Sequence, residues 1–557
     1  MAETLARRVF EWVGGRPWAV LLLTLAVALP ALLLHLGWQP LLVDEPIRAL
    51  VSLEMHYSGQ FFAPTLQGFP YYNKPPLFNW LLVALFRLSG RHDEWIVRLP
   101  TVAALLLYCA AIWRVLRPRL GSRVAFTVAL AFATTGRVLF YDSFLGLIDL
   151  WHAGLTWLAF MAVWHLGQRG QWGRLFVLTY ALTAVGFLLK GLPSLVFQAL
   201  ALGVYCLATK QVKRLFSWQH VLGVLVLVGI LGAYFLIYSH HNSLATALAT
   251  LWDQSSQRTV AAQRLQDSVR YVLLFPFDFI RHFLPWTLLL VLLLPRRARQ
   301  LVWAEPFLCY NALLFLAVLP VYWLSPATIP RYLFMLVPLG LTVLIPLYPA
   351  AQLGAANLAG APGAVGSLEG APVRWLNATL LLLLAVTALA PLVGGLVAVA
   401  PALGPVGTAV LTHLRGVPAY WLPGALLSLV LAGLTYLFWK MPDYRLLLLG
   451  YFLLVLRLSF DVFVFPGRLV TSPEVAYRAA AVRVGRETRG RPLELWPNAL
   501  LDNVEAYYIA RERGQTLFTA HLPPRPGMLY LAEPWQAQAT GRPFRVLDKF
   551  VIDRKKD

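Results

Sequence analysis

Apolar runs of about 18–22 residues recur along almost the whole chain, separated by short polar segments; such a run is long enough for a helix to cross a hydrocarbon core of about 30 Å. The alternation of polar and apolar residues that a membrane β-barrel needs is absent. The pattern therefore predicts an all-α polytopic membrane protein with about 13 transmembrane helices. We place the spans at approximately 17–38, 95–113, 124–140, 150–167, 175–189, 192–209, 218–239, 279–295, 301–324, 332–350, 374–397, 419–439 and 444–465.

Basic linkers set the expected orientation, because Lys and Arg collect in cytoplasmic loops. Three linkers, Arg114–Arg123, Lys210–Arg214 and Arg296–Arg299, are strongly basic, and Arg7 and Arg8 precede the first span. We therefore expect the N-terminus and all three linkers inside, and the C-terminus outside.

Segments between the spans complete the predicted organisation. Residues 77–88 are apolar but short and follow two prolines, so we interpret them as an interfacial or re-entrant helix that returns to the outer face. The segments 39–94 and 240–278 are then extracytoplasmic loops with juxtamembrane helices. Residues 1–466 form the transmembrane domain, and the more charged residues 467–557 predict a small α/β domain on the outer face.

Composition excludes two other classes of protein. The chain has 557 residues, of which 59% are hydrophobic and 13% charged, so a soluble protein of this size is excluded. The net charge of +21 is explained by basic cytoplasmic loops, and we expect no nucleic-acid partner. The three cysteines lie in apolar runs and are interpreted as packing residues.

Charged residues gather where predicted spans meet the outer face. Asp44, Glu45 and Arg48 follow the first span at once, and Lys74 precedes the interfacial helix. A second set, far away in sequence, consists of Asp142, Asp149 and Arg331. Ionisable groups at that depth are costly and usually functional. Together they predict a site for an anionic, membrane-embedded substrate, in which carboxylates handle a proton or a hydroxyl group.

These residues also carry a resemblance to a known family. The Asp44-Glu45 pair, the Lys74-Pro75-Pro76 sequence about 30 residues later and Asp149 about 105 residues later resemble the C-type lipid-dependent glycosyltransferases (GT-C fold). Within them, the chain is similar to the group of protein mannosyltransferases and aminoarabinose–lipid A transferases. The resemblance covers most of residues 1–350, including Leu284-Pro285-Trp286 and Pro330-Arg331-Tyr332, and extends to the C-terminal third only in architecture.

The resemblance implies transfer of a sugar from a polyprenyl phosphate to an outer-leaflet or periplasmic acceptor, a glycolipid such as lipid A or a protein, with inversion. It implies a multi-pass protein of the bacterial inner membrane whose active site faces the periplasm. Asp44 and Asp149 correspond to the catalytic acids, and Lys74, Arg331 and Tyr332 to groups that bind the donor phosphate. We expect the remaining candidates to bind substrate or to support the site: Glu45, Arg48, Tyr71, Tyr72, Asn73, Asp142 and Arg258.

The sequence departs from the family in two places that bear on the substrate. Asn73 occupies the position at which the aminoarabinose transferases carry a Glu beside the lysine, which leaves the choice of sugar open. The loop Trp252–Arg258 has no His of the kind expected from the lipid A branch.

Each candidate also has a plainer structural interpretation. Asp44 or Glu45 could cap a helix that starts at Pro46, and Asp149 could complement a helix dipole. Lys74 could extend to the interface without binding a ligand. The Lys190-Gly191-Leu192-Pro193 sequence is interpreted as a structural turn between two spans, although it lies near the outer face, where a phosphate contact remains open.

Two further functions compete with transfer of a sugar. A transporter or flippase of lipid-linked glycans would also have many spans, but it predicts charges in the middle of several spans, and the chain has few there. A polymerase or ligase of polyprenyl-linked glycans could share the architecture. No cofactor is required by the sequence, although Asp44 and Asp149 could hold a divalent cation.

Overall fold

The computed structural model describes residues 17–256, 265–325, 328–353, 371–397, 421–466, 472–497 and 501–520, with short pieces up to residue 546. In this part of the chain, seven helices are long and apolar enough to cross a membrane, or nine if each of two bent pairs is one span. The protein is therefore a multi-span membrane protein, as predicted, whereas the number of 13 spans stays a prediction.

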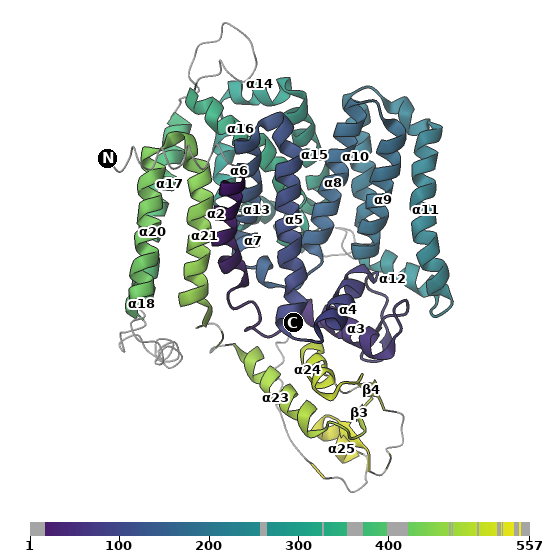
Figure 1. The fold of residues 1–557 in the computed structure, drawn as a ribbon. Helices are drawn as coiled ribbons and strands as arrows, with labels where there is room; N and C mark the ends of the chain where they lie inside the picture. The colour runs from purple at the N-terminus through teal and green to yellow at the C-terminus, as the bar shows by residue number, and fades with distance from the viewer. Residues whose placement is uncertain are drawn as a thin grey trace.

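Long helices stand side by side in one bundle (Figure 1). Large apolar side chains from distant segments, such as Trp157, Trp286 and Tyr310, are fully buried between them. Helices α9 and α11 pack against each other, and so do α5 with α6 and α8 with α9. The bundle consists of α2 (Pro17–Leu33), α5 (Glu94–Leu120), α6 (Ser122–Ala133), α7 (Gly136–Phe140), α8 (Asp149–Gln168), α9 (Trp172–Lys190), α10 (Pro193–Ala208), α11 (Trp218–Ser239), α13 (Leu265–His282), α14 (Arg296–Ala304), α15 (Pro306–Trp323), α16 (Leu336–Leu353), α17 (Ala371–Thr387), α18 (Ala390–Val397), α20 (Trp421–Lys440) and α21 (Arg445–Phe463).

Short 3-10 helices, labelled η, join several of these elements. They are η1 (Asp142–Phe144), η2 (Val212–Phe216), η4 (Trp286–Leu293), η5 (Pro330–Leu333) and η7 (Pro442–Tyr444). The predicted span 279–295 is not one straight helix, because α13 and η4 meet there at an angle of 114°. Proline at position 285, between the two elements, lacks the backbone N–H that a continuous helix would use.

Two helices and a small hairpin cover one end of the bundle. Helix α3 (Glu45–Ser58) leads into the hairpin β1 (Thr65–Leu66) and β2 (Phe69–Pro70), and α4 (Leu77–Ser89) packs on α3. Helix α4 has only 13 residues and is too short to be a candidate span, which agrees with the interfacial helix predicted over 77–88. The segment 240–278 contains α12 (Leu244–Ser256) and most of α13, so it is partly helical, while its place beside the membrane stays a prediction.

The basic linkers lie at the opposite end of the bundle. Figure 1 shows α14, which carries Arg296–Arg299, at the end remote from α3, α4 and α12. The Arg114–Arg123 linker lies there as well, because α5 starts beside α4 and runs the length of the bundle. The linker Lys210–Arg214 precedes α11, whose other end leads into α12. The structure thus places the three basic linkers on one side and the Asp44–Lys74 segment on the other.

The C-terminal region forms a small α/β unit next to α3 and α4 (Figure 1). A parallel sheet of three strands has the order β4-β3-β5. Tyr507 and Tyr508 of its central helix are fully buried, and Tyr508 Oη accepts a hydrogen bond from the Leu41 N–H. The predicted α/β character is therefore confirmed. Its elements are α23 (Pro473–Glu487), β3 (Leu493–Leu495), α24 (Asn503–Arg513), β4 (Phe518–Thr519), β5 (Leu529–Leu531) and α25 (Pro534–Ala539).

Candidate active site

Asp44 immediately precedes α3, but its side chain does not cap that helix. Instead, a carboxylate oxygen of Asp44 accepts a 2.6 Å hydrogen bond from Nη2 of Arg331, a residue 287 positions away. The Asp44 side chain is 47% exposed, whereas that of Arg331 is 2% exposed. Asp44 is therefore a charged group that is fixed on one side and open on the other, as a group that meets a substrate must be.

Arg331 joins the two predicted catalytic acids. Its Nη2 contacts Asp44, and its Nε lies 3.3 Å from Oδ2 of Asp149. Arg331 belongs to η5, which packs against α7 and against α8, the helix that Asp149 begins. Three segments that are far apart in the sequence thus meet at one guanidinium group, whose planar fork suits two carboxylates.

Lys190 completes this cluster, and sequence reasoning had interpreted its segment as a structural turn. Nζ of Lys190 donates a 2.6 Å hydrogen bond to Oδ1 of Asp149, and both side chains are buried. The same Nζ lies 3.9 Å from the ring centroid of Tyr332, which is within the range of a cation–π interaction. The signal for this residue was its position, a lysine in the last turn of a largely apolar helix, at the same end of the bundle as Asp44.

Lys74 and Asp142 lie near this cluster. Lys74 is close enough to His152 to act on it electrostatically, and His152 lies one turn after Asp149 with Nε2 3.1 Å from Oγ of Ser194. Asp142 binds Arg137 at 2.5 Å, and Asp149 lies close enough to act electrostatically on Asp142. The structure therefore brings Lys74 and Asp142 to the region of the two catalytic candidates, together with His152, which the sequence analysis did not single out.

The segment that carries Lys74 is held by a buried carboxylate of α3. Glu54 accepts hydrogen bonds from the Thr65 hydroxyl at 2.5 Å, the Gln67 N–H at 2.7 Å and the Gly68 N–H at 3.3 Å. Burial raises the pKa of the Glu54 carboxyl, and these three hydrogen bonds oppose that rise. Glu54 thereby fixes the β1–β2 turn, and Lys74 follows β2 by four residues.

Glu45 supports the site without facing it. Its side chain is fully buried, and both of its oxygens are bound by Arg98 at 2.8 and 2.9 Å. The Gly146 N–H also donates to Glu45, at 2.5 Å. A side chain at position 146 has no room, because its Cβ would lie 2.6 Å from the Val97 carbonyl oxygen. Glu45 thus ties the segment before α8 to the start of α3, which carries Asp44.

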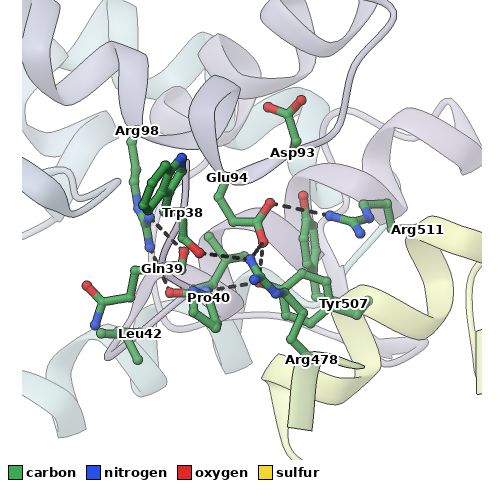
Figure 2. Close-up of polar contacts among 12 residues, drawn as sticks. Trp38, Gln39, Pro40, Leu42, Asp93, Glu94, Arg98, Arg478, Tyr507 and Arg511 are labelled. Atoms are coloured by element: carbon green, nitrogen blue, oxygen red, sulfur yellow. Dashed lines mark hydrogen bonds and ion pairs between the residues drawn. The ribbon is translucent and has the colours of Figure 1, made fainter. Parts of the chain in front are cut away.

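Arg98 also fixes the loop that precedes Asp44. Its guanidinium donates to the carbonyl oxygens of Leu36, Gln39 and Pro40, each at 2.8 Å. Figure 2 shows this side chain pointing at Gln39 and Pro40, whereas Glu94, one turn earlier in α5, points toward Arg478 and Arg511. The position of Asp44 therefore depends on an arginine that is 1% exposed.

The remaining candidates have different surroundings. Arg48 is buried, and its guanidinium lies 5.7 Å from the Tyr71 ring centroid. Tyr72 packs at the edge of a cluster that contains Tyr234 and Tyr238, and Asn73 is exposed. Arg258 lies outside the residues that the structure describes.

The cluster is suited to anion binding and proton handling. In the described part of the chain, no group of three His, Cys, Asp or Glu residues could hold a metal ion. The two carboxylates that could have shared a cation, Asp44 and Asp149, instead share the Arg331 guanidinium. Cationic groups on Lys190 and Arg331 lie beside a half-exposed carboxylate, which is an arrangement that can stabilise a leaving phosphate and orient a nucleophile.

Comparisons with known proteins agree with this geometry. Residues 73–238 match the family model of the dolichyl-phosphate-mannose-protein mannosyltransferases. A relative from Pseudomonas savastanoi pv. phaseolicola, named undecaprenyl phosphate-alpha-4-amino-4-deoxy-L-arabinose arabinosyl transferase, is 31% identical over 206 residues, 35% of this chain and 37% of the relative. The protein of the same name from Edwardsiella ictaluri is 30% identical over 198 residues, 34% of each chain. This chain thus spans little more than a third of the length of these curated relatives.

Solved structures extend the likeness to nearly the full chain. The crystal structure of ArnT from Cupriavidus metallidurans bound to undecaprenyl phosphate has a TM-score of 0.64 at 20% identity and covers 92% of this chain and 86% of its own. The apo form gives a TM-score of 0.62, also at 20% identity, over 91% of this chain and 86% of its own. The protein has the GT-C fold, and the resemblance stated from Asp44, Lys74 and Asp149 is confirmed.

Proposed function

We propose that this protein is an integral membrane glycosyltransferase that moves a sugar from a polyprenyl phosphate to an acceptor at the outer face of the membrane. The observation that carries the proposal is the junction of Asp44, Arg331 and Asp149, with Lys190 bound to the last of them. These residues come from four segments of the chain. Their charges gather at one end of the bundle, as expected for chemistry on a lipid-linked substrate rather than for a path through the membrane.

The proposed reaction assigns a task to each charge. The leaving phosphate gains negative charge as the glycosidic bond breaks, so Lys74 and Lys190 stabilise the transition state more than the ground state. Asp44 is the half-exposed carboxylate, and it orients the acceptor hydroxyl and accepts its proton on the face opposite the leaving group. Such an in-line attack inverts the anomeric centre. Arg331 keeps the carboxylates of Asp44 and Asp149 in fixed positions during the reaction.

The relatives suggest the chemical class of both substrates. Two of them are named for transfer of an arabinose derivative from undecaprenyl phosphate, and one solved structure holds undecaprenyl phosphate. We therefore propose undecaprenyl phosphate as the donor carrier and a glycolipid such as lipid A as the acceptor, with a protein acceptor as the alternative. The exposed Asn73, where the aminoarabinose transferases carry a Glu, favours a sugar without an amino group.

The same proposal includes a location. The basic linkers and the Asp44–Lys74 segment lie at opposite ends of the bundle. Since basic loops stay in the cytoplasm, we propose a protein of the bacterial inner membrane with its N-terminus in the cytoplasm and its active site on the periplasmic side.

Incubation of the purified protein with labelled undecaprenyl-phosphate sugars and lipid A tests the proposal. We expect covalent transfer of label to the lipid and release of undecaprenyl phosphate. Movement of the labelled donor across proteoliposomes without any transfer to lipid A or protein would instead support a flippase and contradict the proposal.

Lys190→Met tests the role of the residue that the sequence analysis set aside. Lys190 stabilises the transition state more than the ground state, and loss of a charge-assisted contact to phosphate costs about 1.5–3 kcal/mol, so we expect kcat/KM for the donor to fall roughly 10- to 100-fold, chiefly through kcat. Steady-state kinetics with a fixed acceptor measure this change. Lys213→Met, an exposed lysine in η2 at the opposite end, should leave the kinetics unchanged. A normal kcat/KM for the donor in a folded Lys190→Met protein would remove Lys190 from the donor site.

A further inference from the structure

A second charged site lies outside the cluster around Asp44, between the membrane domain and the C-terminal unit. A cleft of about 480 Å³ is present there, in the size range of sites for small ligands. The turn between α4 and α5 forms one wall, and α23 and α24 form the other. The charged residues that line the cleft and enter the argument are Arg91, Asp93, Glu94, Arg478, Arg486 and Arg511.

The wall from α23 results from helical spacing. Arg478, Val482 and Arg486 recur every four residues and therefore share one face of the helix. Arg511 approaches from α24, and Arg91 from the membrane domain. Four guanidinium groups from three separate segments thus line one cleft. This arrangement differs from basic residues that are scattered over a surface, because the positive charges converge on one space.

The inner part of the cleft is ordered by one carboxylate. Glu94 accepts hydrogen bonds from Arg478 at 3.0 Å and from Tyr508 at 2.8 Å, and it lies 3.5 Å from Arg511 (Figure 2). The Arg478 and Arg511 side chains are only 28% and 18% exposed. Arginines held in this way present their remaining N–H groups in a fixed direction, as bidentate binding of a phosphate requires.

The outer part of the cleft is open. Arg91 and Arg486 are paired with Asp93 and Glu512, but their side chains are 63% and 68% exposed. Exposed pairs of this kind contribute little to stability, because solvent screens the two charges. A doubly charged phosphate that entered the cleft could therefore recruit both arginines at small cost.

We infer that this cleft binds a phosphate group on the headgroup of a membrane glycolipid. The position of the cleft indicates that this phosphate belongs to a lipid rather than to a soluble molecule, because the cleft lies where α5, a candidate membrane span, begins at Glu94. It is also linked to the active site, since Arg478 donates to the Trp38 carbonyl oxygen at 3.1 Å (Figure 2). Asp44 is only six positions after Trp38 in the sequence, no more than about 21 Å of extended chain. The identity of the lipid as the acceptor rests on the proposed function.

Binding of labelled lipid A to the purified full-length protein, without any donor, tests this inference. We expect the double variant Arg91→Gln/Arg486→Gln to bind phosphorylated lipid A about tenfold more weakly than the parent protein. Both side chains are largely exposed, so the change should leave the fold intact. Lipid A stripped of its phosphates should bind the parent protein as weakly as intact lipid A binds the variant.

The matched control is Arg483→Gln/Arg489→Gln, which removes the same charge from exposed positions of α23 and the turn after it that do not line the cleft. Equal loss of affinity in this control, or equal binding of the two forms of lipid A, would overturn the inference. Inorganic phosphate that bound as tightly as the lipid would overturn its assignment to a headgroup. Because no sugar is transferred in this assay, a protein that binds lipid A through the cleft but transfers nothing would refute only the proposed function.

Discussion

Asp44→Asn should reduce transfer of the sugar by about 10²–10⁴-fold, the range in which a positioned general base contributes. The substitution keeps the size of the side chain and its ability to accept a hydrogen bond from Arg331, but it removes the negative charge that attracts the acceptor proton. The loss should appear in kcat rather than in the KM of the donor, because Asp44 acts on the acceptor. Single-turnover transfer from labelled undecaprenyl-phosphate sugar measures it directly.

Asp443→Asn is the matched control, since Asp443 is an exposed aspartate in η7, in the turn between α20 and α21. It should retain full activity. Thermal unfolding of both variants separates loss of chemistry from loss of structure, and the half-exposed position of Asp44 makes a large change in stability unexpected. An Asp44→Asn protein with the activity of the parent would remove Asp44 from the reaction.

The membrane bundle could be predicted because its signal is local. An apolar run long enough to cross the bilayer identifies a span without reference to any other segment, as for α9 and α11. The bend between α13 and η4 was not predicted, because hydropathy averages over the apolar residues on both sides of Pro285. Helix direction within 265–295 depends on packing against α15, α16 and α17, which no local pattern reports.

The candidate site was predicted in part, for a related physical reason. Asp44, Asp149 and Arg331 are charged residues at the ends of apolar runs. Because a charged side chain in a membrane is energetically costly, the sequence already indicated that these residues are functional, and the structure brings them together. Lys190 has the same property, but the Gly-Leu-Pro that follows it gave a sufficient structural reason for a turn. The role of Arg98 was not predicted. Its hydrogen-bond partners are carbonyl oxygens of the loop 36–40, and no local sequence pattern indicates that this loop folds back onto the start of α5.

Arg98 fixes the loop 36–40, and Asp44 lies just after the end of that loop. The C-terminal unit adds to the same support, since Arg478 binds the Trp38 carbonyl and Tyr508 receives the Leu41 N–H. The loop that carries Asp44 is thus held from α5 on one side and from α23 and α24 on the other. This double attachment gives the C-terminal unit a positioning role for the active site, in addition to the cleft that it helps to form.

Arg98→Met should lower the free energy of unfolding by about 3–5 kcal/mol, because it leaves the fully buried Glu45 carboxylate without its counter-charge. It also leaves the carbonyl oxygens of Leu36, Gln39 and Pro40 without a donor. Denaturant unfolding of the detergent-solubilised protein, followed by tryptophan fluorescence, measures the change. Arg114→Met, at an exposed position on the same helix, should change stability by less than about 0.5 kcal/mol.

A second substitution separates the ion pair from the hydrogen bonds. Glu45→Gln keeps an acceptor oxygen for the Gly146 N–H but places an NH2 group beside the Leu42 N–H, and it removes the buried charge. The double variant Glu45→Gln/Arg98→Met should therefore be more stable than Arg98→Met alone, since no unpaired charge remains buried. If the two substitutions instead changed the free energy of unfolding additively, the cost of burying the Glu45 charge would not depend on Arg98. The loop before Asp44 would then be held chiefly by the hydrogen bonds from Arg98 to its carbonyl oxygens.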